Sequence, residues 1–252
     1  MSASRTATEL LARAARPLGL EAWRVVEGQH QIATRKLVDS DAEHLVLEAA
    51  IDAAKPAPPP GAGHLHYLLA TPFRYPPLRH GSRFGTRFAR GIWYGARSVR
   101  TALAEVAYYR LVFLEGTRAA LPRLELQLTA FEARLRTPRG VDLTRAALAA
   151  SLSQVSSPTS YAASQRLGRS AREARIGVLL YRSARDPDGG TAVAVLEPEA
   201  FASSRPRRFT TWHCVVTRDA VELSRRDFLR HESHRFERRA FLVRGQLPRP
   251  AI

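Results

Sequence analysis

The sequence predicts an α+β domain preceded by a small helical extension, and three observations support this fold class. Its 252 residues suffice for one domain of ordinary size with an appendage at one end. Short apolar segments of strand length are interspersed with segments of helical length and periodicity. From residue 64 onward their order is β-β-α-β-α-α-β-β-β, which lacks the regular βαβ alternation of a doubly wound sheet.

The first 60 residues differ from the rest and predict the helical extension. Residues 5–16 and 39–53 have the pattern of helices, and Ser40 with Glu43 has the spacing of a capping box at the start of the second. The segment KPAPPPGAG at 55–63 then ends regular structure, because consecutive prolines favour an extended conformation. We therefore divide the chain into an extension with a Pro-rich linker over 1–60 and a main domain over 61–252.

The main domain is predicted to mix short strands with longer helices. The clearest helix covers 98–114, where Ser98 is placed to cap its start and Gly116 lies just beyond its end. The segment RLELQLTAF alternates apolar and polar residues, as a strand buried on one side does. Strands are predicted at 64–71, 91–96, 123–131, 177–181, 191–197 and 210–216, and further helices near 142–152 and 161–173.

Composition indicates an ordinary globular protein. Hydrophobic residues make up 45% and charged residues 25% of the chain, which excludes a disordered or fibrous class. No apolar run approaches the roughly 20 residues that a membrane span needs, and the N-terminus reads as an amphipathic helix rather than a signal peptide, so we expect a cytoplasmic protein. Cys214 is the single cysteine, and the histidines have no metal-ligand spacing, so neither a disulfide framework nor a metal cofactor is expected.

The net charge of +16 raises the alternative of a nucleic-acid-binding protein. Only Lys36 and Lys55 are lysines, and the arginines are spread over the whole chain. The densest cluster, at 205–239, has few aromatic residues at stacking spacing and no nucleic-acid-binding motif. A solvated basic surface is therefore the favoured interpretation, and a non-catalytic, Arg-rich nucleic-acid-binding protein, an acidic protein partner or a phosphate-rich ligand stays as an alternative.

One carboxylate in the clearest helix needs an explanation. Residues 99–114 are apolar on nearly every side, so the helix should be buried over most of its circumference. Its charged residues are Arg100, Glu105 and Arg110. Because burial of an unpaired ion is costly, Glu105 should either form an ion pair with a core arginine or open into a cavity as a catalytic group.

The stretch FRYPPLRHGSRFGTRFARGIWYGA at 73–96 brings arginines and aromatic residues close to glycines. Guanidinium groups bind phosphate oxygens in bidentate fashion, and aromatic rings stack planar bases. An ordinary basic surface loop would have a similar composition. This stretch therefore indicates a phosphate-bearing ligand only in combination with other features.

A serine at a strand end completes the set of candidates. Ser183 lies in YRSARDPDGG, where the predicted strand 177–181 gives way to a turn. Such a serine usually caps the turn. No Gly-x-Ser-x-Gly motif surrounds it, so a hydrolase-type nucleophile is not expected.

Together these segments resemble the RES domain, a family named for its Arg, Glu and Ser and found in toxins of bacterial toxin–antitoxin pairs. The likeness covers roughly residues 64–200 and is carried by TPFRYPPLRHGSRFG, GIWYGARSVRTALAEVAYYR, TSYAASQRLG and GVLLYRSARDPDGGTAVAVLEP. Arg74 resembles the first arginine of the family, and Arg83, in GSRF, stands where Gly-Gly-Arg-Trp is more usual. Tyr94 follows Arg83 by eleven residues, and Glu105 follows Tyr94 by eleven, a spacing similar to that of the family.

The resemblance implies a core similar to that of ADP-ribosyltransferases, with short strands and flanking helices. It also implies an enzyme that degrades NAD⁺ at the nicotinamide–ribose bond by hydrolysis or phosphorolysis, as an NAD⁺ glycohydrolase or phosphorylase. Some members of the family instead transfer ADP-ribose to a protein, so the acceptor of ADP-ribose (water, phosphate or protein) stays open. NAD⁺ would be the substrate, and no metal is implied.

Roles for individual residues follow from the same resemblance. Glu105 would stabilise the positive charge that develops on the ribose. Arg74 and Arg83 would bind the diphosphate, with Arg87 as a third candidate. Tyr75 and Tyr94 would stack on the nicotinamide or position its ribose. Ser183 would donate a hydrogen bond to the ribose or carboxamide.

The resemblance also implies partners. A cognate antitoxin protein of the Xre type would neutralise the chain, which would contact nucleic acid only indirectly through that antitoxin. A homo-oligomer is a further possibility, and no membrane association is expected. The N-terminal 60 residues are not part of the usual small toxin of this family, and we expect them to serve partner binding or dimerisation.

Overall fold

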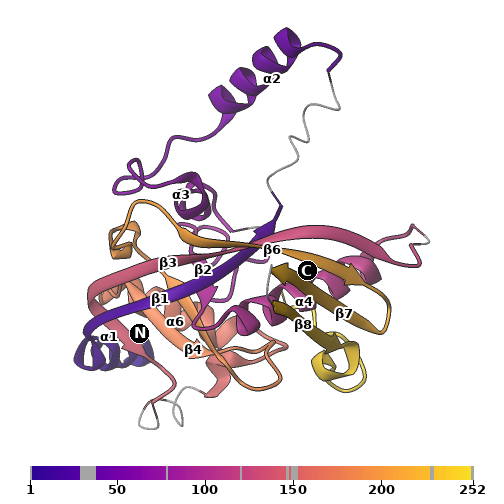
Figure 1. Ribbon diagram of the computed structural model, residues 1–252. Coiled ribbons are helices and arrows are strands. Elements are labelled where there is room, and N and C mark those ends of the chain that lie inside the picture. Colours follow the sequence, from indigo (N-terminus) through magenta and orange to yellow (C-terminus); the bar gives the residue numbers. More distant parts are fainter. Residues whose placement is uncertain are drawn as a thin grey trace.

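The computed structural model describes residues 2–28, 38–77, 79–119, 121–145, 148, 153–227 and 230–250 of the chain. The fold is α+β, as predicted, with one mixed sheet and helices on its flanks (Figure 1). The strands are β1 (Arg16–Glu27), β2 (Trp93–Ala96), β3 (Leu124–Asp142), β4 (Val178–Arg182), β5 (Thr191–Val195), β6 (Arg207–Val216), β7 (Ala220–Asp227) and β8 (Arg230–Glu237).

The order of strands in the sheet is β1-β2-β5-β4-β3-β6-β7-β8, and β1 also pairs with β3. The pairings β1-β2-β5-β4-β3-β1 therefore close into a ring of five strands, and β6, β7 and β8 extend the sheet beyond β3. Closure of this kind removes open strand edges from the centre of the fold.

The long strand β3 organises the sheet. Most of its length pairs antiparallel with β1, from Arg16 opposite Gly140 to Glu27 opposite Leu128. Its other edge is shared, because β6 pairs with its first part and β4 pairs in parallel with its end. The N-terminal strand β1 is therefore an integral part of the central sheet.

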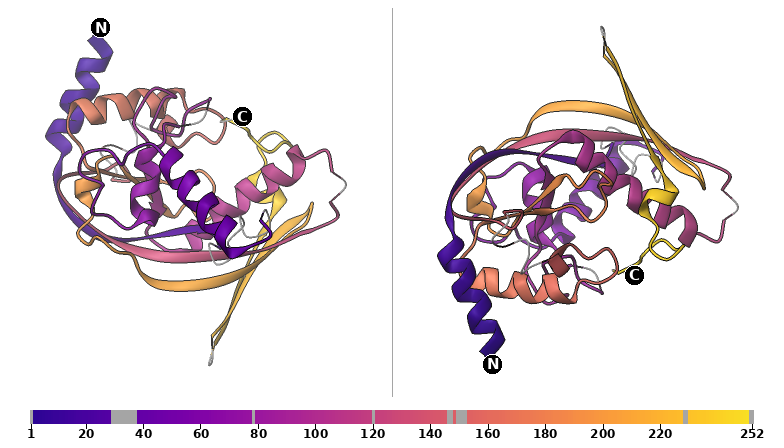
Figure 2. Two further views of the ribbon diagram at one scale, coloured as in Figure 1. Left: turned by 90° about the horizontal axis from the view of Figure 1, so that it is seen from above. Right: turned by 90° about the horizontal axis from the view of Figure 1, so that it is seen from below.

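The helices are α1 (Ser2–Ala14), α2 (Asp41–Ala54), α3 (Tyr67–Arg74), α4 (Val99–Gly116) and α6 (Ala162–Glu173), with short 3₁₀ turns η2 (Ser153–Ser156), η3 (Pro198–Ala200) and η4 (Arg238–Phe241). Helix α1 packs beside α6 (Figure 2). Helix α2 stands apart from the sheet, and its Leu45 and Val46 are each 71% exposed (Figure 1). No helix among the described residues is long and apolar enough to span a membrane.

Helix α4 is the central helix of the largest part of the core. Ser98 caps its start by accepting a hydrogen bond of 3.1 Å from the backbone N–H of Thr101. Its apolar residues, Leu103 and Leu111 among them, pack on Leu128 of β3 and Trp212 of β6. Burial of each large apolar side chain contributes about 1.5–3 kcal/mol, so this contact fixes α4 firmly against the sheet.

Most elements expected from the sequence are confirmed. The predicted helices at 5–16, 39–53, 98–114 and 161–173 correspond to α1, α2, α4 and α6, and five of the predicted strands correspond to β2, β3, β4, β5 and β6. The predicted helix near 142–152 falls largely outside the described residues, and its first residue, Asp142, is the last of β3.

The strand predicted at 64–71 is wrong, because this segment contains the start of helix α3. The imidazole of His66 caps the helix by accepting a hydrogen bond from the backbone N–H of Leu68. The apolar run of this segment buries Leu68, Leu69 and Phe73 on one side of a helix instead of alternating across a strand. A short apolar run is compatible with a strand or with a helix, and in this segment the cap at His66 favours the helix.

The predicted extension over residues 1–60 is helical only in part. Residues 16–27 form β1, which lies between two helices of this segment and joins the central sheet. The division of the chain at residue 60 stays a prediction, and β1 connects the first part structurally to the second.

Candidate active site

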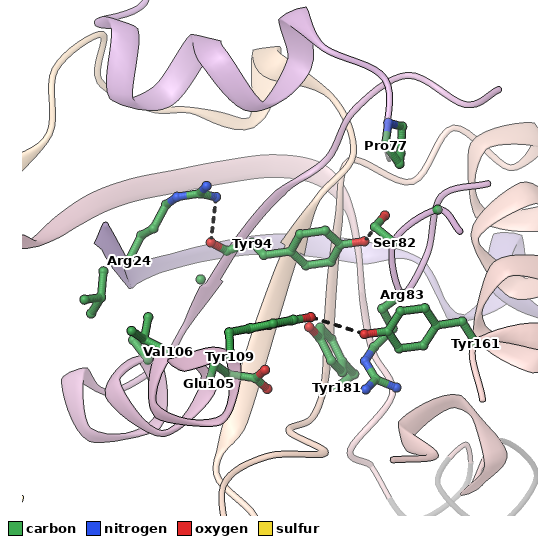
Figure 3. A pocket seen from close by; sticks show the side chains of 14 residues that line it. Arg24, Pro77, Ser82, Arg83, Tyr94, Glu105, Val106, Tyr109, Tyr161 and Tyr181 are labelled. Atoms are coloured by element: carbon green, nitrogen blue, oxygen red, sulfur yellow. Dashed lines mark hydrogen bonds between the residues drawn. The ribbon is translucent and has the colours of Figure 1, made fainter. Parts of the chain in front are cut away.

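A pocket of about 540 Å³ opens beside the first half of α4 (Figure 3). It is lined by Arg24, Val25, Pro77, Gly81, Ser82, Arg83, Tyr94, Gly95, Ala102, Glu105, Val106, Tyr109, Tyr161 and Tyr181. Among the described residues that line it, Glu105 supplies the one carboxylate, and Arg24 and Arg83 supply the positive charges. A pocket with aromatic walls, one carboxylate and two arginines is suited to bind an anionic ligand that contains rings.

Helix α4 presents Glu105 to this pocket. The neighbouring positions Ala102, Val106 and Tyr109 also line it, so one face of the helix forms a wall of the cavity. Glu105 has no ion pair with an arginine among the described residues. The sequence left an ion pair and a catalytic role open for this carboxylate, and the geometry places it in a cavity instead of in a core ion pair.

Ser183, at the end of β4, holds the carboxylate in place. Its hydroxyl donates a hydrogen bond of 2.5 Å to Oε1 of Glu105. The hydroxyl oxygen of Ser183 in turn accepts hydrogen bonds from the backbone N–H groups of Arg185, at 3.1 Å, and Asp186, at 3.0 Å. Because a hydroxyl has one proton, this network directs the proton to Glu105 and leaves Ser183 an orienting group.

The loop that carries Ser183 is fastened to the start of α4 through Asp186. Thr101 donates a 2.8 Å hydrogen bond to the buried carboxylate, and Arg100 contributes a contact of 2.5 Å. Burial opposes ionisation of Asp186, but these hydrogen bonds and the nearby guanidinium outweigh it and hold the pKa of the carboxyl below its ordinary value. The contacts of Asp186 therefore fix the loop that carries Ser183 against the helix that carries Glu105.

Tyr94, on β2, forms the wall opposite Glu105. Its hydroxyl lies 2.9 Å from Oγ of Ser82 and accepts a hydrogen bond of 3.0 Å from the backbone N–H of Phe84. Burial raises the pKa of Tyr94 to about 12, so the phenol stays neutral at physiological pH. Tyr94 thus connects the central sheet to the loop that carries Arg83.

A second aromatic wall is formed by Tyr109 of α4 and Tyr161, which precedes α6. Their hydroxyls lie 3.2 Å apart, as the dashed line in Figure 3 marks. About half of the surface of Tyr109 is exposed, but desolvation of its hydroxyl beside Tyr161 raises its pKa well above the ordinary value, with the charges of Tyr161 and Glu105 acting in the same direction. Tyr109 therefore remains an uncharged hydrogen-bonding group.

Arg83 is buried, and much of its hydrogen-bonding capacity is used by the protein itself. Its Nη1 donates to the carbonyl oxygens of Val155 and Ser157, both at 3.0 Å, and its guanidinium lies 4.9 Å from the centre of the Tyr161 ring. Gly81 allows this loop to turn, because its φ of +78° is a conformation that other residues rarely adopt. Arg83 brings a fixed positive charge to the pocket.

Arg24, on β1, is a pocket residue that the sequence did not reveal. It donates a hydrogen bond of 3.0 Å to the carbonyl oxygen of Tyr94, and its Nε is buried without a partner. Burial lowers its pKa to about 10, and no carboxylate of the described chain forms an ion pair with it. An arginine set between Trp23 and Val25 in a strand-like segment is the signal that could have identified it.

Several residues assigned from the resemblance do not line the pocket. Arg74 is the last residue of α3, and Tyr75 follows it with 42% of its surface exposed. Arg87 is exposed, with its guanidinium 4.4 Å from the centre of the Phe88 ring. The pocket brings together Arg83, Tyr94 and Glu105, with Ser183 behind the carboxylate, while the roles given to Arg74, Tyr75 and Arg87 stay predictions.

The Arg-rich segment after residue 205 forms strands and ion pairs. Its arginines neutralise neighbouring carboxylates in several places, and these pairs are Arg207 and Arg208 with Glu132, Arg225 with Glu232, Arg235 with Glu222 and Glu237, and Arg238 with Glu115. This arrangement agrees with a solvated surface, the interpretation that the sequence favoured. Within the part of the chain that the structure describes, no cluster of three or more His, Cys, Asp or Glu side chains is arranged to hold a metal ion.

Comparison with known proteins adds two findings. The family model of the RES domain matches residues 58–217. The fold is similar to that of a chain in the crystal structure of the M. tuberculosis MbcT-MbcA toxin-antitoxin complex, with a TM-score of 0.50 and 14% sequence identity over 84% of this chain and 92% of that chain. No curated protein sequence matches the chain.

Proposed function

The chain belongs to the RES-domain family, and we propose that it cleaves the bond between nicotinamide and ribose in NAD⁺. The observation that carries this proposal is the carboxylate of Glu105, which lines an aromatic pocket and is oriented by the hydroxyl of Ser183. A diphosphate-bearing dinucleotide suits a pocket that contains Arg24 and Arg83.

Cleavage of the nicotinamide–ribose bond is favoured by a negative charge beside C1′ of the ribose. As the glycosidic bond breaks, its electron pair moves to the nitrogen of the nicotinamide ring, which loses its positive charge, and positive charge develops at C1′ of the ribose. A carboxylate fixed beside C1′ stabilises that charge electrostatically. Glu105 is the acid in this position, and its hydrogen bond from Ser183 keeps it from turning toward solvent.

A nucleophile completes the reaction on the ribose. Water would add its oxygen to C1′ and release one proton, which gives ADP-ribose, and phosphate would give the corresponding ADP-ribose phosphate. The neutral phenols of Tyr94 and Tyr109 bound the pocket and limit the access of further water.

The activity can be tested on the purified chain. Incubation with NAD⁺ should release nicotinamide, and parallel reactions with and without phosphate identify the acceptor from the second product. Glu105→Gln, which keeps the shape of the side chain and removes its charge, should release nicotinamide at least about a hundredfold more slowly. Transfer of the labelled ADP-ribose part of NAD⁺ to protein in a cell lysate, with release of nicotinamide and without free ADP-ribose, would indicate ADP-ribosylation of a protein instead.

We further propose that the chain acts as the toxin of a toxin–antitoxin pair. The family membership and the likeness of its fold to a chain of a toxin-antitoxin complex support this role. Induced expression in a bacterial host should deplete cellular NAD⁺ and arrest growth, and co-expression of a cognate antitoxin of the Xre type should restore both. Growth arrest by the Glu105→Gln variant would contradict a toxicity that depends on this site.

A further inference from the structure

A second hollow lies next to the active-site pocket on the surface of α4. Its volume is about 440 Å³, and it is lined by Tyr109, Val112, Phe113, Gly116 and Thr117. Tyr109 lines both this hollow and the pocket of Glu105, so the two are neighbours that share one aromatic wall. We call the second hollow the α4 hollow.

The α4 hollow continues along the helix from the catalytic candidate. Glu105, Tyr109, Val112, Phe113 and Gly116 are spaced by 4, 7, 8 and 11 residues from the first of them, which places them on one face of a helix. At a rise of 1.5 Å per residue, Phe113 lies about 12 Å along the axis from Glu105. A ligand that reacts at Glu105 and extends along α4 would therefore reach this hollow.

The chemistry of the hollow suits an uncharged planar group. The aromatic side chains of Tyr109 and Phe113 are 49% and 53% exposed, although α4 is otherwise largely buried. No charged side chain is among its lining residues. Aromatic side chains that line a hollow and keep an exposed face can stack against a planar group that enters it.

We propose that the α4 hollow binds the adenine base of NAD⁺, an inference that rests on the proposed function. Beyond the reacting ribose, NAD⁺ continues through a diphosphate and a second ribose to a neutral, planar base. The arginines are in the pocket of Glu105 and serve the charged part of the ligand, and the aromatic hollow next to it receives the base by stacking.

Gly116 offers a direct way to fill the hollow. A Cβ atom added at this position would meet no other atom within 4 Å, so a larger side chain enters open space instead of the core. Gly116→Val should therefore occlude the hollow and leave the fold intact. Gly19→Val is a matched control, because a Cβ at Gly19 likewise meets nothing within 4 Å and Gly19 is in β1, away from both cavities.

The test compares two substrates that contain the same scissile bond. NAD⁺ carries the adenylate half, and nicotinamide mononucleotide lacks it. Gly116→Val and Phe113→Ala should lower the ratio of kcat/KM for NAD⁺ to kcat/KM for the mononucleotide by about tenfold, the size expected for one base stacked on one ring. Gly19→Val and Phe209→Ala, the latter at an aromatic side chain that is 52% exposed outside both cavities, should leave the ratio unchanged.

A binding measurement separates this inference from the proposed function. Titration of AMP into the Glu105→Gln variant by calorimetry should show binding that Gly116→Val weakens in the same background. If the chain cleaved neither substrate but bound AMP, and Gly116→Val weakened that binding, the adenine subsite would be supported and the proposed function would be contradicted. The adenine subsite would be overturned if Gly116→Val and Phe113→Ala left the substrate ratio unchanged while their melting temperatures stayed like that of the unmodified chain. It would also be overturned if these variants affected protein partners without any effect on AMP or NAD⁺.

Discussion

The hydroxyl of Ser183 and the carboxylate of Glu105 are joined by a hydrogen bond of 2.5 Å across 78 residues of sequence. Ser183 is buried at the end of β4, and Glu105 is on α4, so this bond connects the sheet to the central helix at the pocket. Two backbone N–H groups occupy the remaining capacity of the serine oxygen. The arrangement makes the orientation of Glu105 depend on Ser183.

Ser183→Ala should lower kcat for NAD⁺ cleavage by about ten- to a hundredfold. This is the range expected when a carboxylate loses one hydrogen bond worth about 1.5–3 kcal/mol. KM should change less than kcat, because the hydroxyl of Ser183 donates its proton to Glu105. Steady-state kinetics with nicotinamide release as the readout check this, and complete loss of activity together with a covalent serine adduct in the unmodified enzyme would contradict an orienting role.

Arg24→Gln should raise KM for NAD⁺ by about ten- to a hundredfold, because a charged hydrogen bond to the diphosphate is lost. Cleavage of nicotinamide riboside, which has no phosphate, should change much less. Arg97→Gln serves as the control, since Arg97 donates to the carbonyl oxygen of Glu21 on the same strand pair and does not line the pocket. Equal losses for both substrates would show that Arg24 acts only through the fold.

Asp186→Asn should destabilise the chain at pH 7 by about 1–3 kcal/mol, because Thr101 and Arg100 lose a charged acceptor. The pKa of Asp186 is lowered in the folded state, so its contribution to stability is present above the ordinary carboxyl pKa and is lost as the pH falls through the folded value. The difference in melting temperature between the variant and the unmodified chain should therefore shrink below about pH 4. Asp219→Asn, at an exposed position outside these contacts, is the matched control for the change of charge.

The sequence predicted the parts of the site that local patterns determine. Glu105 is a carboxylate in an otherwise apolar helix, and the cost of burying such a group pointed to either an ion pair or a cavity. Helix α4 begins directly after Ser98, the cap that the sequence predicted. These features depend on residues close to one another in the chain.

The missed parts depend on contacts between distant segments. Arg24 reaches the pocket because β1 pairs with β3 more than a hundred residues later, and nothing near β1 indicates that pairing. Arg74, for which the resemblance implies contact with the diphosphate, is the last residue of α3 and is not among the lining residues, and its role stays a prediction. Strands β7 and β8 were not predicted from their dense charges, and in the structure these charges pair across the hairpin, as Arg225 does with Glu232 and Arg235 with Glu222.

The most direct test of the proposed activity is the release of nicotinamide from NAD⁺ by the purified chain, followed by chromatography with and without phosphate. We expect steady release by the unmodified protein and release at least about a hundredfold slower by Glu105→Gln at an unchanged melting temperature. No release under either condition, or equal release by the Glu105→Gln variant, would contradict the claim that this carboxylate drives cleavage of NAD⁺.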